Sequence, residues 1–474
     1  MPENTYIIIS FSLYLLIMLA IGVYFYFKTK NLSDYILAGR SLNPWVTSLS
    51  AQASDMSGWL LMGLPGYAFV AGIEAGWIAL GLAIGTYINW KFIAKRLRIT
   101  TEKFGDAITL PDYFEKRFND KSRVLRMVSA IFILIFFMIY TSSGFVAGAK
   151  LFNQVFGISY QNALLIGVFI IIGYTFLGGF NAVSWTDFIQ GLMMFLAVVA
   201  IPIIGIFKVD NIHQRVIEIN PNFMNPFIDT DGNPLSAIAI TSLLAWGLGY
   251  FGQPHILARF MAIKSADKIK KARIIAMVWV VISLAGALLV GIIGATWVTN
   301  VPRDTETIFM ILINGFTHPA IAGLLLAAIL AAVMSTADSQ LLVTSSSLVE
   351  DFYKIVIRKN ASDREQVWIS RLAVLLVAIS AYLIARNPNG SVLNLVSYAW
   401  AGFGAAFGPL VIFSLYWKSM TRWGALAGLI SGGVTVIVWK NLSGGIFEMY
   451  EIIPGFIIAC IAIVVVSKVS SALR

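Results

Sequence analysis

The sequence has one cysteine, three histidines and few charges. Cys460 alone cannot form an internal disulfide, and it excludes every metal motif that needs several cysteines. The histidines lie far apart without ligand spacing, which argues against a histidine metal centre. Charged residues make up 12% of the chain and hydrophobic residues 58%, a composition that excludes an ordinary soluble globular protein. The composition therefore predicts an all-α polytopic membrane protein.

Long apolar runs recur along the whole sequence. Residues 6–27 form an uncharged run long enough to span a bilayer, and the run lacks the basic start and cleavage site of a signal peptide. It therefore predicts a first transmembrane helix. Further runs bring the expected number of transmembrane helices to about thirteen, near residues 45–72, 75–95, 124–152, 160–179, 185–207, 236–257, 274–298, 318–349, 367–385, 391–417, 423–440 and 449–467.

The net charge of +10 is a signal of membrane topology. Most lysines and arginines fall in the loops on one side of the predicted bundle, and the positive-inside rule assigns that side to the cytoplasm. The expected N-terminus is therefore outside and the C-terminus cytoplasmic. Because the basic charge is explained by topology within a lipid bilayer, it gives no reason to expect a nucleic-acid partner.

The loops carry three further expectations. Residues 110–118 (LPDYFEKRF) predict a short interfacial helix opened by Pro111. Residues 209–235 predict turns at the outer surface, and their DTDGN sequence lacks the distant glutamate of a calcium loop. Residues 259–273 (RFMAIKSADKIKKAR) predict a solvated basic loop.

The stretch 51–66 (AQASDMSGWLLMGLPG) is the most informative part of the chain. Asp55 is the only charge between Arg40 and Glu74, which places its carboxylate at membrane depth. A charge there costs about 2.5–3.5 kcal/mol on insertion scales and usually faces a cavity. Glycines and Pro65 break the helix, and non-helical backbone that lines a cavity offers carbonyl ligands to a hard cation. The alternative interpretation is a polar helix pair or a folding defect tolerated by its neighbours.

A second interrupted segment is residues 245–255 (AWGLGYFGQPH), with three glycines and a proline. Its literal G-x-G-x-x-G pattern follows no strand, so a dinucleotide site is not expected. Two interrupted helices in comparable places predict an inverted-repeat transporter with a site near the membrane midplane. Trp246 and Tyr250 are four residues apart and share a helix face, although aromatic packing explains that pattern equally well.

A third feature lies in residues 324–353. Ala332, Ser335 and Thr336 share one face of the predicted helix. Hydroxyls and a carbonyl on one face either complete an oxygen cage for a cation or join two helices. The nearby acid and interrupted backbone favour the cation site. Asp187 is a second intramembrane acid, interpreted as either a helix cap or a functional group.

Six long motifs resemble the sodium/solute symporter family over nearly the whole chain: GRSLNPWVTSLSAQASDMSGWLLMGLPG, LPDYFEKRF, LGGFNAVSWTDFIQ, AWGLGYFGQPHILARFMA, AAILAAVMSTADSQLLV and LVSYAWAGFGAAFGPL. The resemblance implies a bacterial inner-membrane protein with a LeuT-type five-plus-five inverted repeat and discontinuous helices. One transporter domain, 1–474, is then expected to comprise an extra helix and loop (1–44), two repeats (45–235 and 236–417) and two C-terminal helices (418–474).

The same resemblance implies secondary active transport, in which inward sodium flow drives uptake of L-proline by alternating access. The implied sodium site comprises Ala53, Asp55, Met56, Ala332, Ser335 and Thr336. The implied proline site comprises Ser57, Gly58, Tyr140, Trp246, Tyr250 and Pro254. Arg40 and Asp187 match positions linked to coupling, and Asp338 leaves open a second, weaker cation position shared with Asp187.

Other functions remain open at this point. Pantothenate or sialic acid could replace proline as the solute, and an uncoupled facilitator would not need an acid beside a hydroxyl-lined helix face. A membrane sensor would normally carry a cytoplasmic output domain, which is not expected in this chain. No nucleophile–base pair or metal cluster is visible, so an enzyme is not expected.

Overall fold

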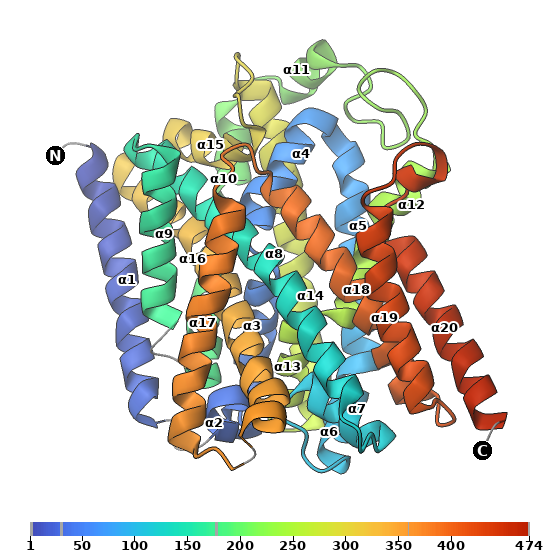
Figure 1. Cartoon of the computed structure of the whole chain (residues 1–474). Coiled ribbons are helices and arrows are strands. Elements are labelled where there is room, and N and C mark those ends of the chain that lie inside the picture. The colour runs from blue at the N-terminus through green and yellow to red at the C-terminus, as the bar shows by residue number, and fades with distance from the viewer. Residues whose placement is uncertain (1–2, 29–31, 176–178, 359, 473–474) are drawn as a thin grey trace.

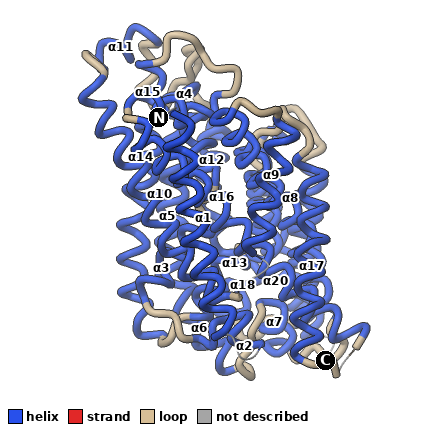
Figure 2. Tube along the Cα trace, turned by 90° about the vertical axis from the view of Figure 1, so that its left-hand side faces the viewer, coloured by secondary structure: helices blue, strands red, loops and turns tan. Residues whose placement is uncertain are grey.

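The computed structural model describes residues 3–28, 32–175, 179–358 and 360–472, and these residues are almost entirely helical (Figures 1 and 2). Within these ranges there are two isolated β-bridges and no strand. The predicted all-α architecture is therefore confirmed. Lys30, which belongs to the predicted charge asymmetry, and residues 177–178 of the LGGFNAVSWTDFIQ motif lie outside the described residues.

The helices run between two opposite faces of one bundle (Figure 1). We call the end where α1 begins the N-terminal face and the end where α20 finishes the C-terminal face. In the described ranges the chain makes thirteen passes, formed by α1 (Glu3–Lys28), α3 (Pro44–Asp55) with α4 (Leu64–Ala71), α5 (Gly76–Ile88) with α6 (Ala94–Lys103), α8 (Val124–Phe156), α9 (Tyr160–Thr175), α10 (Phe180–Lys208), α12 (Ala237–Leu244) with α13 (Pro254–Ala262), α14 (Ile269–Trp297), α16 (Pro319–Ser347), α17 (Asp363–Ala385), α18 (Val392–Tyr416), α19 (Arg422–Trp439) and α20 (Ile452–Ala472).

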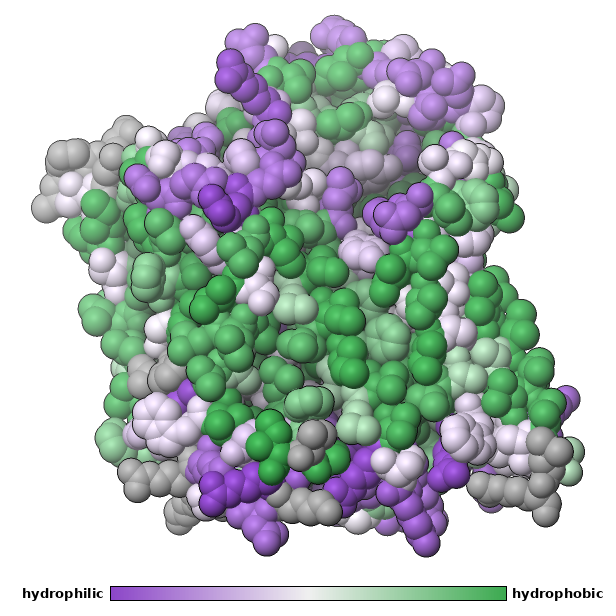
Figure 3. Space-filling model, viewed as in Figure 1, coloured by the Kyte–Doolittle hydropathy of each residue, from purple (hydrophilic) through white to green (hydrophobic). Residues whose placement is uncertain are grey.

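The surface matches a membrane environment. On the face shown in Figure 3, hydrophobic side chains form a broad band across the middle of the molecule, whereas hydrophilic ones gather at both ends. Ten helical stretches of the described chain are long and apolar enough to cross a membrane, accompanied by three shorter apolar helices. Helices suit this setting because they satisfy their own backbone hydrogen bonds where no water is present.

Two passes are broken where the sequence predicts it. The first leaves its α-helix at Met56 (φ −83°, ψ 76°) and resumes after Gly58 as a π-helical turn, Trp59–Gly63. The second passes through a 3₁₀ segment, Ala245–Gly252, before α13 begins. In Figure 1, α3 leads up from the C-terminal face and α12 leads down from the N-terminal face. The two breaks therefore meet at mid-depth with opposite chain directions.

Gly58 is needed at the first break because the backbone there lies against α8. A Cβ at Gly58 would lie 2.7 Å from the Ala147 Cβ, closer than side chains normally approach. The glycine therefore allows the interrupted segment to pack tightly against its neighbour.

Short helices lie at the ends of the bundle: α2 (Leu32–Leu37), α7 (Leu110–Phe118), α11 (Ile212–Ile219) and α15 (Ile308–Phe316). The interfacial helix predicted at 110–118 is confirmed as α7, with the Thr109 hydroxyl accepting the Asp112 N–H (3.1 Å). Turns at 209–235 are confirmed only in part, because α11 occupies the start of that loop. The sequence reasoning missed α15, since its apolar run is too short for a membrane span.

The predicted basic loop 259–273 is wrong at its two ends. The α13 helix continues to Ala262 and α14 begins at Ile269, which leaves only a short connection. Arg259 is consequently a helix residue and is fully buried. A buried guanidinium needs a compensating acid. For Arg259 this acid is Asp187.

Candidate functional site

The first break in the chain faces the middle of α16. The Ser335 hydroxyl donates to the Ala53 carbonyl (2.8 Å), and the Thr336 hydroxyl reaches the same oxygen (3.3 Å). The Ser335 hydroxyl also lies 3.2 Å from the Ala332 carbonyl, one helical turn earlier. The structure therefore brings together four of the six residues of the implied sodium site. Of the other two, Met56 is buried at the start of the break, and Asp55 directly precedes it.

Asp55 is the last residue of α3 and is fully buried. Its Oδ2 accepts a hydrogen bond from the Tyr250 hydroxyl (2.7 Å), while Oδ1 has no hydrogen-bond partner among the described residues. The Asp55 carbonyl accepts from Tyr140 Oη (3.1 Å) and Trp59 Nε1 (3.0 Å). We call the Ala53 carbonyl and the Ser335 and Thr336 hydroxyls the oxygen cluster. Asp55 thus connects this oxygen cluster to the aromatic side chains that bind it.

The chemistry of this oxygen cluster suits a hard cation. Carbonyls, hydroxyls and one carboxylate are the ligands that hard cations prefer. In the described ranges no group of three or more His, Cys, Asp or Glu could hold a metal ion, so a transition-metal site has no support there. A buried carboxylate oxygen without a partner is costly, and a cation held between it and the Ala53 carbonyl would compensate it.

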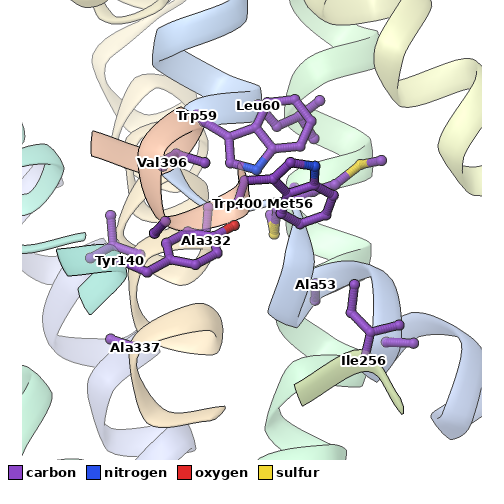
Figure 4. Packing of buried hydrophobic residues seen from close by; sticks show 14 of the residues in the cluster. Ala53, Met56, Trp59, Leu60, Tyr140, Ile256, Ala332, Ala337, Val396 and Trp400 are labelled. Atoms are coloured by element: carbon purple, nitrogen blue, oxygen red, sulfur yellow. The ribbon is translucent and has the colours of Figure 1, made fainter. Parts of the chain in front are cut away.

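Buried aromatic rings pack against one another beside this cluster. Trp246 lies 6.3 Å from Trp59 between ring centres, and Tyr250 lies edge-on to Trp400 at 5.0 Å. Trp400 Nε1 donates to the Trp246 carbonyl (2.7 Å). Figure 4 shows the rings of Trp59, Trp400 and Tyr140 close to the end of α3. The rings come from four separate passes, so the wall is a product of tertiary packing.

Trp59 and Trp400 were missed in the sequence reasoning. Trp59 directly follows Gly58, and this position inside the break was an available signal. Trp400 lies in the YAWAGFG segment, whose glycine-rich pattern gave no indication of a contact with 245–252. The structure explains the pairing, since a Cβ on Gly249 would collide with the Trp400 indole.

Ser57, Gly58 and Pro254 also lie at the breaks. The Ser57 N–H donates to the Asp55 carbonyl (3.0 Å), which keeps Ser57 close to the carboxylate. Pro254 is buried as the first residue of α13 and lines a cavity that extends toward α7. The implied proline-site residues are therefore gathered around the two breaks, with Pro254 on the side of the C-terminal face.

Asp187 forms a separate buried cluster with Arg259. Arg259 Nη2 lies 3.0 Å from Asp187 Oδ2, and both side chains are fully buried. The Ser50 hydroxyl donates to the same carboxylate oxygen (2.7 Å) and accepts from Arg259 Nε (3.1 Å). Asp187 lies beyond the first turn of α10, so the helix-cap interpretation is wrong. Asp338 is also buried and interacts electrostatically with Arg259.

The pairing of Asp187 with Arg259 predicts a large effect on stability. We expect Arg259→Met to destabilise the protein by about 3–5 kcal/mol, because it leaves the Asp187 carboxylate buried without a cation. The double variant Arg259→Met with Asp187→Leu should lose much less stability. Thermal unfolding midpoints in detergent would measure both, with the exposed Arg386→Met as control. Equal destabilisation by the single and double variants would contradict this expectation.

Arg40 lies at the C-terminal face, away from the oxygen cluster. Its guanidinium contacts Asp106 (2.7 Å) and donates to the carbonyls of Met261 (2.7 Å) and Ala107 (2.9 Å). Burial lowers the pKa of Arg40, and the charge of Asp106 opposes that effect. The twelve residues of α3 separate Arg40 from the break, a rise of about 18 Å. The Arg40 side chain therefore binds the end of α13 and lies away from the oxygen cluster.

A second set of ion pairs lies at the N-terminal face. Lys150 of α8 contacts Glu306 (2.6 Å) and Asp304 (2.7 Å). The Glu306 carboxylate also accepts the backbone N–H groups of Val392 and Leu393 (3.0 Å each) at the start of α18. A cavity of about 590 Å³ adjoins these residues. The central site thus lies between two polar clusters that join separate helices.

Comparisons with known proteins agree with this arrangement. The chain matches the sequence profile of the sodium:solute symporter family over residues 35–432. It is 52% identical to the "Sodium/proline symporter" of Salmonella typhimurium, covering 100% of this chain and 95% of that protein. It is 51% identical to the "High-affinity proline transporter PutP" of Bacillus subtilis, covering 96% of each.

A solved structure resembles the fold. It is described as the substrate-bound outward-open state of a Na⁺-coupled sialic acid symporter, and it covers 98% of each chain with a TM-score of 0.80. At 21% identity this likeness concerns the fold alone. It confirms the predicted LeuT-type architecture with discontinuous helices.

Proposed function

The chain belongs to the sodium:solute symporter family, and from this premise we propose that it couples inward sodium flow to the uptake of L-proline. The observation that carries the proposal is the oxygen cluster of Ala53, Ser335 and Thr336 beside the unpaired Oδ1 of Asp55. Such a donor set suits sodium, which is the driving ion and a transported substrate. Relatives named as proline transporters, about half identical over nearly the full length, support proline as the solute.

The two sites share Asp55. Its Oδ1 has no hydrogen-bond partner among the described residues and is available to a cation, whereas its other oxygen and its carbonyl accept hydrogen bonds from Tyr250 and Tyr140. Sodium bound at Oδ1 would fix the end of α3 and hence the aromatic side chains that hydrogen-bond to it. Proline binding would then be stronger with sodium present, and reciprocity requires proline to strengthen sodium binding by the same factor.

Polar clusters at both faces support alternating access as the transport mechanism. The Lys150–Glu306 cluster joins α8 to the start of α18, and Arg40 joins the segment before α3 to the end of α13. Opening one cluster while the other stays closed would expose the central site to one side at a time. We propose the N-terminal face as the outer side, because the basic loops favour a cytoplasmic C-terminal face.

The division into two inverted repeats, 45–235 and 236–417, is part of the same proposal. The opposite directions of the α3 and α12 breaks support it (Figure 1). Asp187, paired with Arg259 in a second buried cluster, is proposed as a coupling residue, and Asp338 as its neighbour in a weaker cation position. In this conformation the Arg259 guanidinium supplies the positive charge beside Asp187.

Transport in reconstituted vesicles tests the function. Purified protein in proteoliposomes should accumulate radiolabelled proline under an inward sodium gradient, and much less when choline replaces sodium. Equal proline flux in sodium and choline, without accumulation, would instead identify an uncoupled facilitator. Sodium-driven uptake of pantothenate or sialic acid without proline uptake would identify a different solute.

Loss of either hydroxyl ligand should weaken sodium activation. We expect Ser335→Ala and Thr336→Ala each to raise the sodium concentration for half-maximal uptake by about tenfold, since each removes one oxygen from a desolvated site. The sodium dependence of proline uptake measures this. Ser345→Ala is a matched control, because its buried hydroxyl lies on the same helix and, among the described residues, donates to the Leu342 carbonyl of its own helix. Unchanged sodium titrations in both variants would indicate ordinary helix packing.

A further inference from the structure

Tyr450 lies in the connection between α19 and α20, outside the two proposed repeats, yet its ring stacks on Trp246. The ring centres are 5.7 Å apart and the planes are inclined by 29°. Figure 1 shows this connection beside α12 at the N-terminal face. The Trp246 ring therefore contacts two other rings, that of Trp59 at 6.3 Å and that of Tyr450 at 5.7 Å.

Two hydrogen bonds hold Tyr450 in place. Its hydroxyl donates to the Ser397 carbonyl on α18 (2.7 Å), and its N–H donates to the Ser242 hydroxyl on α12 (3.0 Å). The next residues, starting at Ile452, continue into α20, where Ile452 packs on Gly404. Because the ring is buried and anchored to two other passes, its position is defined by the packing of the bundle.

The Trp246 indole is buried and makes ring contacts with Trp59 and Tyr450. Its backbone lies in the 3₁₀ segment 245–252, and its carbonyl is fixed by Trp400 Nε1. Fixing a carbonyl does not fix the indole, whose two side-chain torsions depend on the surfaces packed against it. Tyr450 supplies a stacked surface for the indole, in addition to the tilted contact with Trp59.

We propose that Tyr450 is a positioning residue for the proline site, holding the Trp246 indole at the angle that fits a five-membered ring. The inference rests on the proposed function, because it concerns the solute wall of that site. It extends that function to the α19–α20 connection, which takes part in solute selection through Trp246. Tyr450 itself is not proposed to touch proline.

The test compares two substitutions of Tyr450. Tyr450→Phe keeps the stacked ring and loses only the bond to the Ser397 carbonyl, so its KM for proline should stay within about twofold of wild type. Tyr450→Leu removes the ring and should raise that KM about three- to tenfold, the range of an aromatic pair. The sodium concentration for half-maximal uptake at saturating proline should hardly change. Competition by open-chain amino acids should become relatively stronger.

A matched control comes from the same connection. Phe447 lies edge-on to Trp439 at 4.8 Å and is exposed, so Phe447→Leu should leave proline KM unchanged. A double-mutant cycle with Trp246→Leu tests the route of the effect. In that background Tyr450→Leu should add little, because the indole that it positions is absent.

Each outcome decides the inference. Wild-type proline KM in Tyr450→Leu, equal effects of the Phe and Leu substitutions, or additive effects with Trp246→Leu would each overturn it. If Tyr450→Leu does not reach the membrane, a Tyr450→Phe variant with proline KM raised tenfold would also overturn it. Absence of proline uptake by the wild-type protein in the same vesicles would instead overturn the proposed function.

Discussion

Asp55→Asn should reduce sodium-driven proline uptake by at least about a hundredfold at normal protein level. The substitution keeps the size of the side chain and removes a buried negative charge two residues after Ala53, whose carbonyl accepts from Ser335 and Thr336. The loss of one partner of a desolvated charge pair costs about 3 kcal/mol or more, which corresponds to at least a hundredfold in affinity. Sodium-dependent uptake and sodium binding to the purified protein would both measure it.

Folding should change much less than transport in this variant. Asp55 Oδ2 accepts one hydrogen bond, from Tyr250, and an asparagine carbonyl can accept the same bond. Ser54→Ala is the matched control, because Ser54 is the buried neighbour and donates only to the Ala51 carbonyl. Wild-type sodium dependence in Asp55→Asn would remove Asp55 from the cation site.

Much of the fold could be predicted from the sequence because membrane helices have local signals. Apolar length locates each pass, and glycine or proline within a pass locates a break. Both breaks, at 51–66 and 245–255, were predicted, because the glycines and the proline that interrupt each helix lie within the same short stretch of sequence. The short helix α15 was missed because Ile308–Phe316 is apolar without the length of a span.

Contacts between distant passes had no such local signal. Arg259 stands at the end of a basic stretch and was assigned to a loop, although its partner Asp187 is 72 residues away. The sequence did contain an indication of this ion pair, because an intramembrane acid such as Asp187 requires either a cationic partner or a proton. The stacking of Tyr450 on Trp246 is beyond sequence reasoning, because nothing in either segment indicates the other.

The aromatic wall provides the second large effect. We expect Trp246→Ala to raise the KM for proline about ten- to hundredfold, because a buried ring of this size contributes about 1.5–3 kcal/mol of apolar contact. Sodium affinity should change only modestly, since the ring contacts of Trp246 are with Trp59 and Tyr450, neither of which belongs to the oxygen cluster. Proline uptake at several sodium concentrations separates the two effects.

Tyr250 should behave differently, because it serves both sites. Its ring packs against Trp400, and its hydroxyl donates to Asp55 Oδ2. Tyr250→Phe should therefore weaken sodium activation about tenfold, the value of a hydrogen bond to a charged group, while keeping most of the proline affinity. Tyr250→Ala should impair both sodium activation and proline affinity.

The choice of solute should also depend on the ring. Ring-containing analogues of proline should compete better than open-chain amino acids in the wild-type protein. Equal competition by glycine or alanine would place the solute in a different cavity.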